Sequence, residues 1–366
     1  MRRSTVKIFC FAAIAAAPLA AVPNALAAQC GRVPRLFRPI AEPIPAPAPV
    51  KPKVPGKDGP AHVGETVTID TDAGALKLTI DKLELSAERF KMGDSAMEMP
   101  SAAEKLLIVH YHLQNPNPND VAVSGSTVRF TALDMDRKPH DDVETAVSED
   151  QEDIVDQPLK SGDSVSAVKV IHVPARGPIA ALLVTPGPAE ATPMHVDVTG
   201  HVDKLAPPYV DPQDPTGFNA LPAIEGKIGQ TYQVGDCDLT LQDAEYSNDS
   251  LLNYTGEDAP DDEHSFAVFT FDVTCRNMSG ESFTAGSFNP SLETIDGMQV
   301  DPANAPLLNK TLNLAFQSDL TYGDDRHFRV YFVVSKHDSM ASLTISAAAG
   351  ARKYIYDLSD VQRPPD

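Results

Sequence analysis

Three histidines and three methionines in the first half of the sequence have the types and spacings of a metal site. His110 and His112 stand two residues apart in a segment whose apolar and polar residues alternate. Alternate residues of a strand point to the same face and lie about 6.6 to 6.8 Å apart, so both imidazoles are expected on one face. Such a pair can hold Zn or Cu when a third ligand arrives from a neighbouring strand, and His172 is the candidate.

A methionine-rich loop precedes the two histidines. Its three thioethers belong to Met92, Met97 and Met99. Clustered thioethers suit Cu(I), which makes copper the first metal to consider. Against a metal site, the second half of the chain has Asp272, Thr274 and Val333 at the positions matched to the histidines. Copper or zinc binding is therefore the alternative prediction, and a pair of ordinary surface histidines is the favoured one.

The segments that must position these side chains are predicted to be short strands. Clusters of Gly, Pro, Asn and Asp separate seven such segments in the first half. They are Thr66 to Ile69, Leu76 to Leu85, Lys105 to Asn115, Thr127 to Leu133, Val165 to Val173, Ala180 to Thr185 and Met194 to Val198. In the third segment, Val109, Tyr111 and Leu113 are expected to face a core. No segment has a helical period, so the predicted fold class is all-β, with β-sandwich domains.

The second half of the sequence repeats the order of the first. Gly74 matches Gly235 at an offset of 235 − 74 = 161 residues, and Asn115 matches Asn277 at 277 − 115 = 162. Landmarks that keep this register predict two tandem sandwich domains. The predicted boundaries are 62–204 for the first domain, 205–224 for a linker rich in Pro, Asp and Gly, and 225–362 for the second domain.

The same matching predicts a disulfide bond between Cys237 and Cys275. Cys237 falls opposite Leu76 and Cys275 opposite Leu113, both apolar positions of the first copy. If these are inward positions on neighbouring strands, the bond replaces a leucine pair. It would close a loop of 275 − 237 = 38 residues, worth about 4 kcal/mol in the chain-entropy account.

Several weak motifs recur in both copies. Each copy has a strand ending in Asn (Asn115, Asn277) and a Gly that opens a Val/Phe-rich strand (Gly162, Gly323). A strand ending in Asp lies between them, at Asp136 and at Asp296-Gly297. This pattern resembles an uncharacterised immunoglobulin-like domain family of bacterial secreted proteins and lipoproteins, related to the mycobacterial immunoprotective extracellular protein. The resemblance implies an immunoglobulin-like sandwich outside the cytoplasm and no known chemistry. The first copy departs from the family by having Met-Asp-Arg-Lys where Asp-Gly is usual.

The N-terminus has the features of a secretory signal. Arg2, Arg3 and Lys7 precede an apolar run at 8–21, and Ala25-Leu26-Ala27 gives the small-x-small pattern of a cleavage site. A bilayer-spanning helix needs about 20 apolar residues, so the run is expected to be removed and not retained as a transmembrane helix. The predicted signal peptide covers 1–27.

Residues 28–61 are predicted to be a disordered, Pro-rich tether. Cys30 lies in it without an obvious partner, as an exposed thiol, an intermolecular bridge or a lipidation site. Gln29 stands where a small residue normally precedes a lipidated cysteine, which counts against lipidation.

The chain is strongly acidic, with a formal net charge of −21 at pH 7. Such a surface repels nucleic acid and anionic lipid, so neither is an expected partner. The expected partner is an envelope or extracellular protein or a small ligand.

The sequence contains no convincing catalytic motif. Ser166 and Lys169 match the Ser-x-x-Lys of penicillin-recognising enzymes, but they lie in a predicted strand without the accompanying elements. The prediction is therefore a protein that is not an enzyme: an exported binding or spacer protein of the cell envelope or extracellular space. The alternative is a periplasmic copper or zinc binder that uses His110, His112 and the methionine loop.

Overall fold

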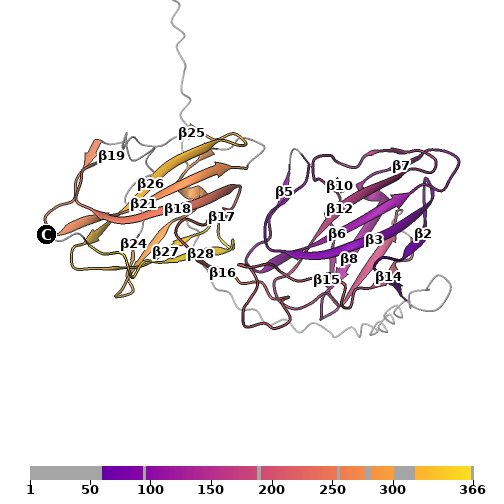
Figure 1. Ribbon diagram of the computed structural model, residues 1–366, viewed down its shortest axis with the longest axis horizontal. Helices are drawn as coiled ribbons and strands as arrows, with labels where there is room; N and C mark the ends of the chain where they lie inside the picture. Colours follow the sequence, from indigo (N-terminus) through magenta and orange to yellow (C-terminus); the bar gives the residue numbers. More distant parts are fainter. Residues whose placement is uncertain are drawn as a thin grey trace, which may run out of the picture. The chain divides into compact units, whose positions relative to one another are not determined.

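The computed structural model describes residues 60–93, 96–187, 191–253, 256–276, 282–300 and 318–363. The predicted signal peptide, Cys30 and nearly all of the tether lie outside these residues. The described residues form strands and two 3-10 helices, η1 (Gly125–Thr127) and η2 (Ala285–Ser287), with no α-helix among them. The all-β fold class predicted from the sequence is confirmed (Figure 1).

Two facing sheets build the first sandwich. One has the order β1 (Ala61–His62), β14 (Met194–Asp197), β13 (Ala181–Pro186), β8 (Val128–Leu133) and β9 (Pro139–Asp141). The other has the order β10 (Val147–Ser148), β12 (Ser164–Pro174), β6 (Glu104–Gln114), β3 (Gly74–Ser86) and β15 (Val202–Asp203), with β2 (Thr66–Thr71) also paired to β3. Tyr111 on β6 packs against Phe130 on β8 with ring centroids 5.0 Å apart, so the buried side chains join the two sheets.

A second sandwich follows with a similar strand order. One sheet runs β16 (Ala223–Gly226), β28 (Lys353–Asp357), β27 (Met340–Ile345), β23 (Ser291–Thr294) and β24 (Gln299–Val300). The other runs β17 (Thr231–Val234), β18 (Cys237–Ser247), β21 (His264–Cys275) and β26 (Asp325–Ser335). Tyr232 on β17 packs against Tyr354 on β28 at 5.0 Å between centroids, which again links the two layers.

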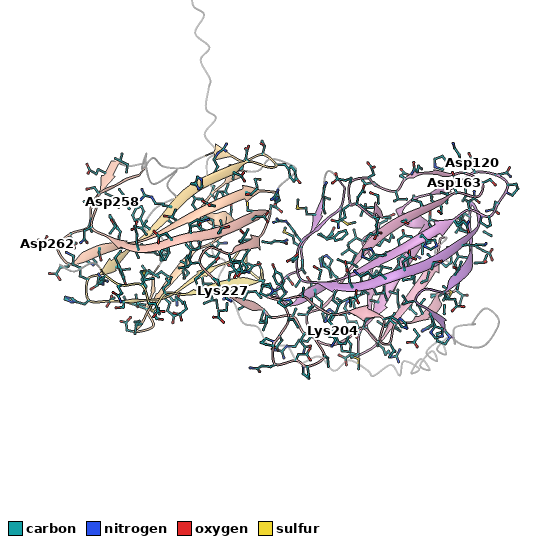
Figure 2. All side chains as sticks on the ribbon, in the orientation of Figure 1. Asp120, Asp163, Lys204, Lys227, Asp258 and Asp262 are labelled. Carbon is teal, nitrogen blue, oxygen red and sulfur yellow. The ribbon has the colours of Figure 1, made fainter. Side chains whose placement is uncertain are left out.

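Four two-stranded pairs complete the described strands. They are β4 (Phe90–Lys91) with β5 (Met97–Glu98), β7 (Val121–Val123) with β11 (Gln157–Leu159), β19 (Leu251–Asn253) with β20 (Gly256–Asp258), and β22 (Ser282–Phe283) with β25 (Ser318–Asp319). Many carboxylates lie in loops at the strand ends, and Figure 2 labels Asp120 and Asp163 in the first sandwich and Asp262 in the second.

The central strand β6 is buried on both faces over its first half. Val109, Tyr111 and Leu113 face the core as predicted. On the opposite face, Leu106 and Ile108 are also buried, because a separate apolar cluster with Phe90 and Met92 covers them. The sequence predicted one buried face, and this second cluster was missed because alternation cannot reveal a loop that folds over a sheet.

The strand pairing corrects the match between the two halves. Both long hairpins carry a bulge, between Ile80 and Lys82 in the first sandwich and between Leu241 and Asp243 in the second. Next to the bulges, Ile80 pairs with Tyr111 in the first sandwich, and Leu241 pairs with Phe271 in the second. Tyr111 on β6 therefore matches Phe271 on β21, which is an offset of 271 − 111 = 160 residues.

Cys275 therefore occupies the place of Asn115 and not of Leu113. The same shift places Thr270 and Asp272 at the positions of His110 and His112. A slip of two residues preserves a pattern that repeats every two residues, so alternation alone could not exclude the wrong match.

The segment predicted as a linker, 205–224, is packed into the molecule. Leu205, Tyr209 and Ala220 are buried, and their apolar side chains connect the cores of both sandwiches into one cluster. Lys105 is fully buried, and its Nζ donates to the carbonyl oxygens of Ala175 at 3.3 Å, of Gly177 at 2.6 Å and of Phe218. The last of these bonds ties β6 to the connecting segment.

Candidate functional site: a braced cleft between the sandwiches

The predicted metal-binding histidines are paired with carboxylates. His110 Nδ1 lies 2.7 Å from Glu149 Oε1, and its Nε2 lies 3.2 Å from Glu84 Oε1. The hydrogen bond with Glu84 raises the pKa of His110, and the same bond lowers the pKa of Glu84 to about 2. Both ring nitrogens therefore already have carboxylate partners, and a metal ion would have to displace one of them.

The other two histidines do not converge with His110. His112 Nδ1 lies 2.9 Å from Asp81 Oδ2, while His172 Nε2 lies 3.1 Å from Glu98 Oε2. His172 pairs with Leu106 across the strands, four residues along β6 from His110. Four residues correspond to about 14 Å of strand, so the structure does not bring the predicted third ligand to the pair.

The three methionines have separate surroundings. Met92 is buried in the cluster over the outer face of β6, and Met97 is half-buried on β5. Met99 is 42% exposed at the edge of the cleft described below. Within the described part of the chain, no group of three or more His, Cys, Asp or Glu side chains is arranged to hold a metal ion.

The two cysteines lie directly across from each other on β18 and β21. Both are buried free thiols, so the predicted disulfide bond is not present in the structure. Cys275 Sγ contacts the carbonyl oxygen of Leu320 at 3.6 Å, and burial raises the pKa of Cys237 to about 12. Asn115, the equivalent residue of the first sandwich, donates its side-chain amide to the carbonyl of Leu159 at 2.8 Å.

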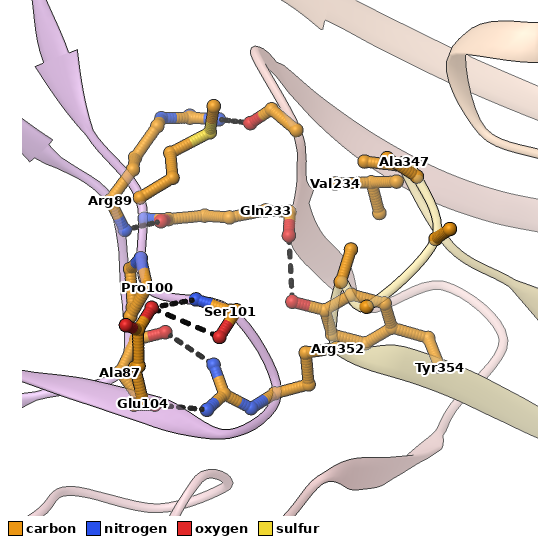
Figure 3. Close-up of a pocket in the computed structure, with 16 residues that line it drawn as sticks. Ala87, Arg89, Pro100, Ser101, Glu104, Gln233, Val234, Ala347, Arg352 and Tyr354 are labelled. Atoms are coloured by element: carbon orange, nitrogen blue, oxygen red, sulfur yellow. Dashed lines mark hydrogen bonds between the residues drawn. The ribbon is translucent and has the colours of Figure 1, made fainter. Parts of the chain in front are cut away.

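A cleft of about 260 Å³ lies where loops of the two sandwiches meet. Figure 3 shows Ala87, Arg89 and Pro100 of the first sandwich facing Val234 and Ala347 of the second. The turn at Gly235 needs glycine, because its φ is +57° and an added Cβ would lie 2.9 Å from the Cβ of Ala347. The two walls are therefore formed largely by small, apolar side chains.

Arg352 braces the cleft from the second sandwich. Its guanidinium is buried and donates to three carbonyl oxygens: those of Leu221 and Ala87 at 2.8 Å and that of Glu104 at 3.2 Å. It also stacks over the ring of Tyr209 at 5.7 Å. One side chain thus fastens both sandwiches and the connecting segment (Figure 3).

Arg89 braces the cleft from the first sandwich. It forms an ion pair with Asp238 and donates to the carbonyl oxygens of Gly235 at 3.2 Å and Cys237 at 3.1 Å. Its backbone N–H donates to Gln233 Oε1 at 2.8 Å. Asp238 also accepts from Arg276 at 2.6 Å, so one carboxylate holds two guanidinium groups.

Glu104 is the acidic group of the cleft. Its Oε2 accepts from the Ser101 hydroxyl at 3.0 Å and from the Ser101 N–H at 3.3 Å. Burial would raise the pKa of Glu104, but the bonds from Ser101 and the nearby His172 outweigh it and hold this pKa below its ordinary value. The carboxylate is thus ionised at neutral pH, and its side chain is 41% exposed.

The cleft residues could not be identified from the sequence. Arg89, Arg352 and Glu104 lie in loops or at a strand end, without a recognisable motif around them. Only the packing of the two sandwiches brings them together, and a pattern within one segment cannot report that packing.

No protein-family model matches the chain, and no curated protein matches it. Among solved structures, it is similar to an uncharacterized β-sandwich protein from Clostridium difficile 630. That match has 12% identity and a TM-score of 0.29, and it covers 37% of this chain and 94% of the other. A second match is the yjhA protein from Bacillus subtilis, with 15% identity, a TM-score of 0.23, and coverage of 36% and 97%. Among the described residues, no helix has the length and hydrophobicity needed to cross a bilayer.

Proposed function

We propose that this protein is an exported, non-catalytic binding protein whose ligand occupies the cleft between its two sandwiches. The cleft is the observation that carries this proposal. Its walls come from both sandwiches, and Arg89 and Arg352 hold them together with a network of hydrogen bonds. A site held in shape before binding loses less entropy when the ligand arrives.

Export is supported by the sequence. The basic residues, the apolar run and Ala25-Leu26-Ala27 form a secretory signal in the correct order. The immunoglobulin-like resemblance points to the same location, and we propose that both sandwiches belong to that family type. Sequencing the N-terminus of the protein purified from its native source tests export, with Ala28 expected as the first residue.

We further propose that Cys237 and Cys275 form a disulfide bond in the oxidising compartment. The N–H of Arg276 donates to the carbonyl of Asp236, while the N–H and C=O of Cys275 bond to the opposite neighbour at Asp324 and Gly323. The two cysteines therefore form a non-hydrogen-bonded pair, whose Cα atoms lie about 4.5 Å apart in antiparallel sheets. That separation lies within the range of disulfide bonds, which is about 4.4 to 6.8 Å between Cα atoms.

The bond forms when a disulfide oxidant accepts two electrons and the two thiols release two protons. Mass spectrometry of a digest prepared without reductant is expected to find the Cys237 and Cys275 peptides linked. Two free thiols in protein isolated from the native compartment would refute this pairing.

The metal-binding alternative receives no such support. His172 lies four residues along β6 from His110, and all three histidines are engaged with carboxylates.

The binding role is tested by blocking the cleft. Ala348 is an exposed residue of the cleft wall, so Ala348→Trp adds bulk there without entering the core. Cross-linking in the native envelope followed by purification is expected to retain a specific partner with the wild type and to lose it with Ala348→Trp. Ala122→Trp, at an exposed position on β7 outside the cleft, is the matched control. Equal recovery of the partner by all three proteins would exclude the cleft as the binding site.

A further inference from the structure

The two arginines of the cleft are committed to the protein itself. The hydrogen bonds described for the guanidinium groups of Arg89 and Arg352 all end on backbone carbonyl oxygens or on Asp238. Arg352 is 6% exposed, and the side chain of Arg89 is 10% exposed. These cations hold the walls in place, so the groups that remain for a ligand are different ones.

Glu104 offers an ionised acceptor that is only partly used. Ser101 occupies Oε2, and the nearest atom of His172 lies 3.5 Å from that same oxygen. For Oε1, no hydrogen-bond partner is found among the residues that the structure describes. An ionised oxygen of this kind forms its strongest hydrogen bonds with a cationic donor.

The remaining surface of the cleft is apolar. Met99 is an exposed large hydrophobic side chain at its edge, and Pro100, Ala347 and Ala348 continue the surface. A long aliphatic chain can lie along such a surface while its charged end reaches a carboxylate, as lysine and arginine side chains do elsewhere in proteins. Methionine adapts its shape to a chain of this kind.

Building on the proposed function, we propose that the cleft binds a lysine side chain presented by a partner polypeptide. The aliphatic stem lies against Met99 and Pro100, and the ammonium group donates to Glu104 Oε1. Arginine fits less well, because its planar fork needs two acceptor oxygens and Ser101 already occupies one of those of Glu104. The net charge of −21 favours the approach of a basic partner from solution.

Two short peptides test this proposal on the full-length mature protein. Acetyl-Ala-Lys-Ala-amide is the probe, and acetyl-Ala-norleucine-Ala-amide has an apolar side chain without the charge. Titration followed by NMR chemical shifts is expected to show about threefold to fivefold tighter binding of the lysine peptide, as one partly exposed charge pair provides. Glu104→Gln is expected to remove that preference while leaving the affinity for the norleucine peptide unchanged.

The matched control is Glu257→Gln, at an exposed position on β20 that is not among the residues lining the cleft. It is expected to bind both peptides as the wild type does. Thermal unfolding of Glu104→Gln verifies that the variant folds, since its amide oxygen can still accept from Ser101.

Equal affinity for the two peptides would overturn the lysine assignment, and so would failure of the lysine peptide to bind. Neither result would by itself overturn the proposed function, which is decided by the loss of the native partner in Ala348→Trp.

Discussion

Single buried charges connect the strands of this protein to its loops, and Lys105 is the clearest case. Its ammonium group is surrounded by three carbonyl oxygens and no carboxylate is described in contact with it. Burial lowers the pKa of Lys105 from 10.5 to about 8. The residue thus stabilises the fold as a hydrogen-bond donor at a cost in charge solvation.

This depressed pKa predicts a pH dependence of stability. Between about pH 8 and 10.5 the folded protein binds fewer protons at Lys105 than the unfolded chain, so the contribution of this residue to stability rises with pH. Urea unfolding of the wild type and of Lys105→Met at pH 7.5, 9 and 10.5 should show a difference that grows in favour of the wild type. Comparing the two proteins cancels the titration of tyrosines. A difference in unfolding free energy that stays constant with pH would contradict the lowered pKa of Lys105.

The raised pKa of His110 predicts that its contribution to stability falls as pH rises. Its raised pKa means that its contribution is complete below about pH 6.5 and is lost as pH rises through the higher folded value. The lowered pKa of Glu84 means that its own contribution is lost as pH falls from about 4.5 towards 2. The pair should therefore stabilise the fold most between pH 4.5 and 6.5.

His110→Gln tests this window. Because the pair is partly exposed, the expected loss is about 1 kcal/mol at pH 5.5, and it should vanish by pH 9. Chemical unfolding at both pH values measures the change, with His201→Gln at an exposed position as control. A loss that is equal at both pH values would show that the ion pair does not contribute.

At the scale of strands and loops, the sequence predicted much of the first sandwich. Alternating residues identified β3, β6, β8 and β12, because each has one face against the core. The cover over Ile108 and the register of Cys275 were not predictable in this way. The burial of Ile108 depends on a loop that folds over the sheet. The register of Cys275 depends on the connection from the bulge to β21, which is one residue shorter than the matching connection from the bulge to β6.

The candidate site was not predicted at all. The metal hypothesis rested on residue types at strand spacing. That spacing predicts which face of the strand the histidines occupy, but it does not predict which side chains lie against that face. In the folded protein, carboxylates from neighbouring strands and loops oppose His110 and His112. Arg352 and Ala87, which meet in the cleft region, are 265 residues apart, and no local pattern links them.

The bracing role of Arg352 leads to a prediction at the scale of strands and loops. Arg352→Met keeps the side chain's bulk but leaves the carbonyls of Ala87, Glu104 and Leu221 without their donor. Buried acceptors that lose their partners cost about 1 to 3 kcal/mol each, so the expected destabilisation for the three is at least about 3 kcal/mol. Urea unfolding measures it, and Arg326→Met, at a side chain that is 40% exposed, should cost less than about 0.5 kcal/mol. Equal effects of the two variants would exclude the bracing role.

For the whole molecule, the described residues imply that the two sandwiches unfold as one unit. Their sheets are separate, yet the buried side chains of both belong to one cluster that continues through Leu205 and Tyr209. Lys105, Arg89 and Arg352 add hydrogen bonds across the same region. Unfolding one sandwich alone would expose this shared surface and leave these charged groups without partners, so an intermediate with one folded sandwich should be poorly populated.

Calorimetry tests this coupling directly. The wild type is expected to show a single transition whose calorimetric and van't Hoff enthalpies agree. Arg352→Met removes the link between Ala87 and the second sandwich, so its transition should broaden or divide in two, whereas Arg326→Met should keep the single transition. Two well-separated transitions in the wild type would mean that the sandwiches are thermodynamically independent. The cleft between them would then lack the fixed geometry on which a preorganised binding site depends.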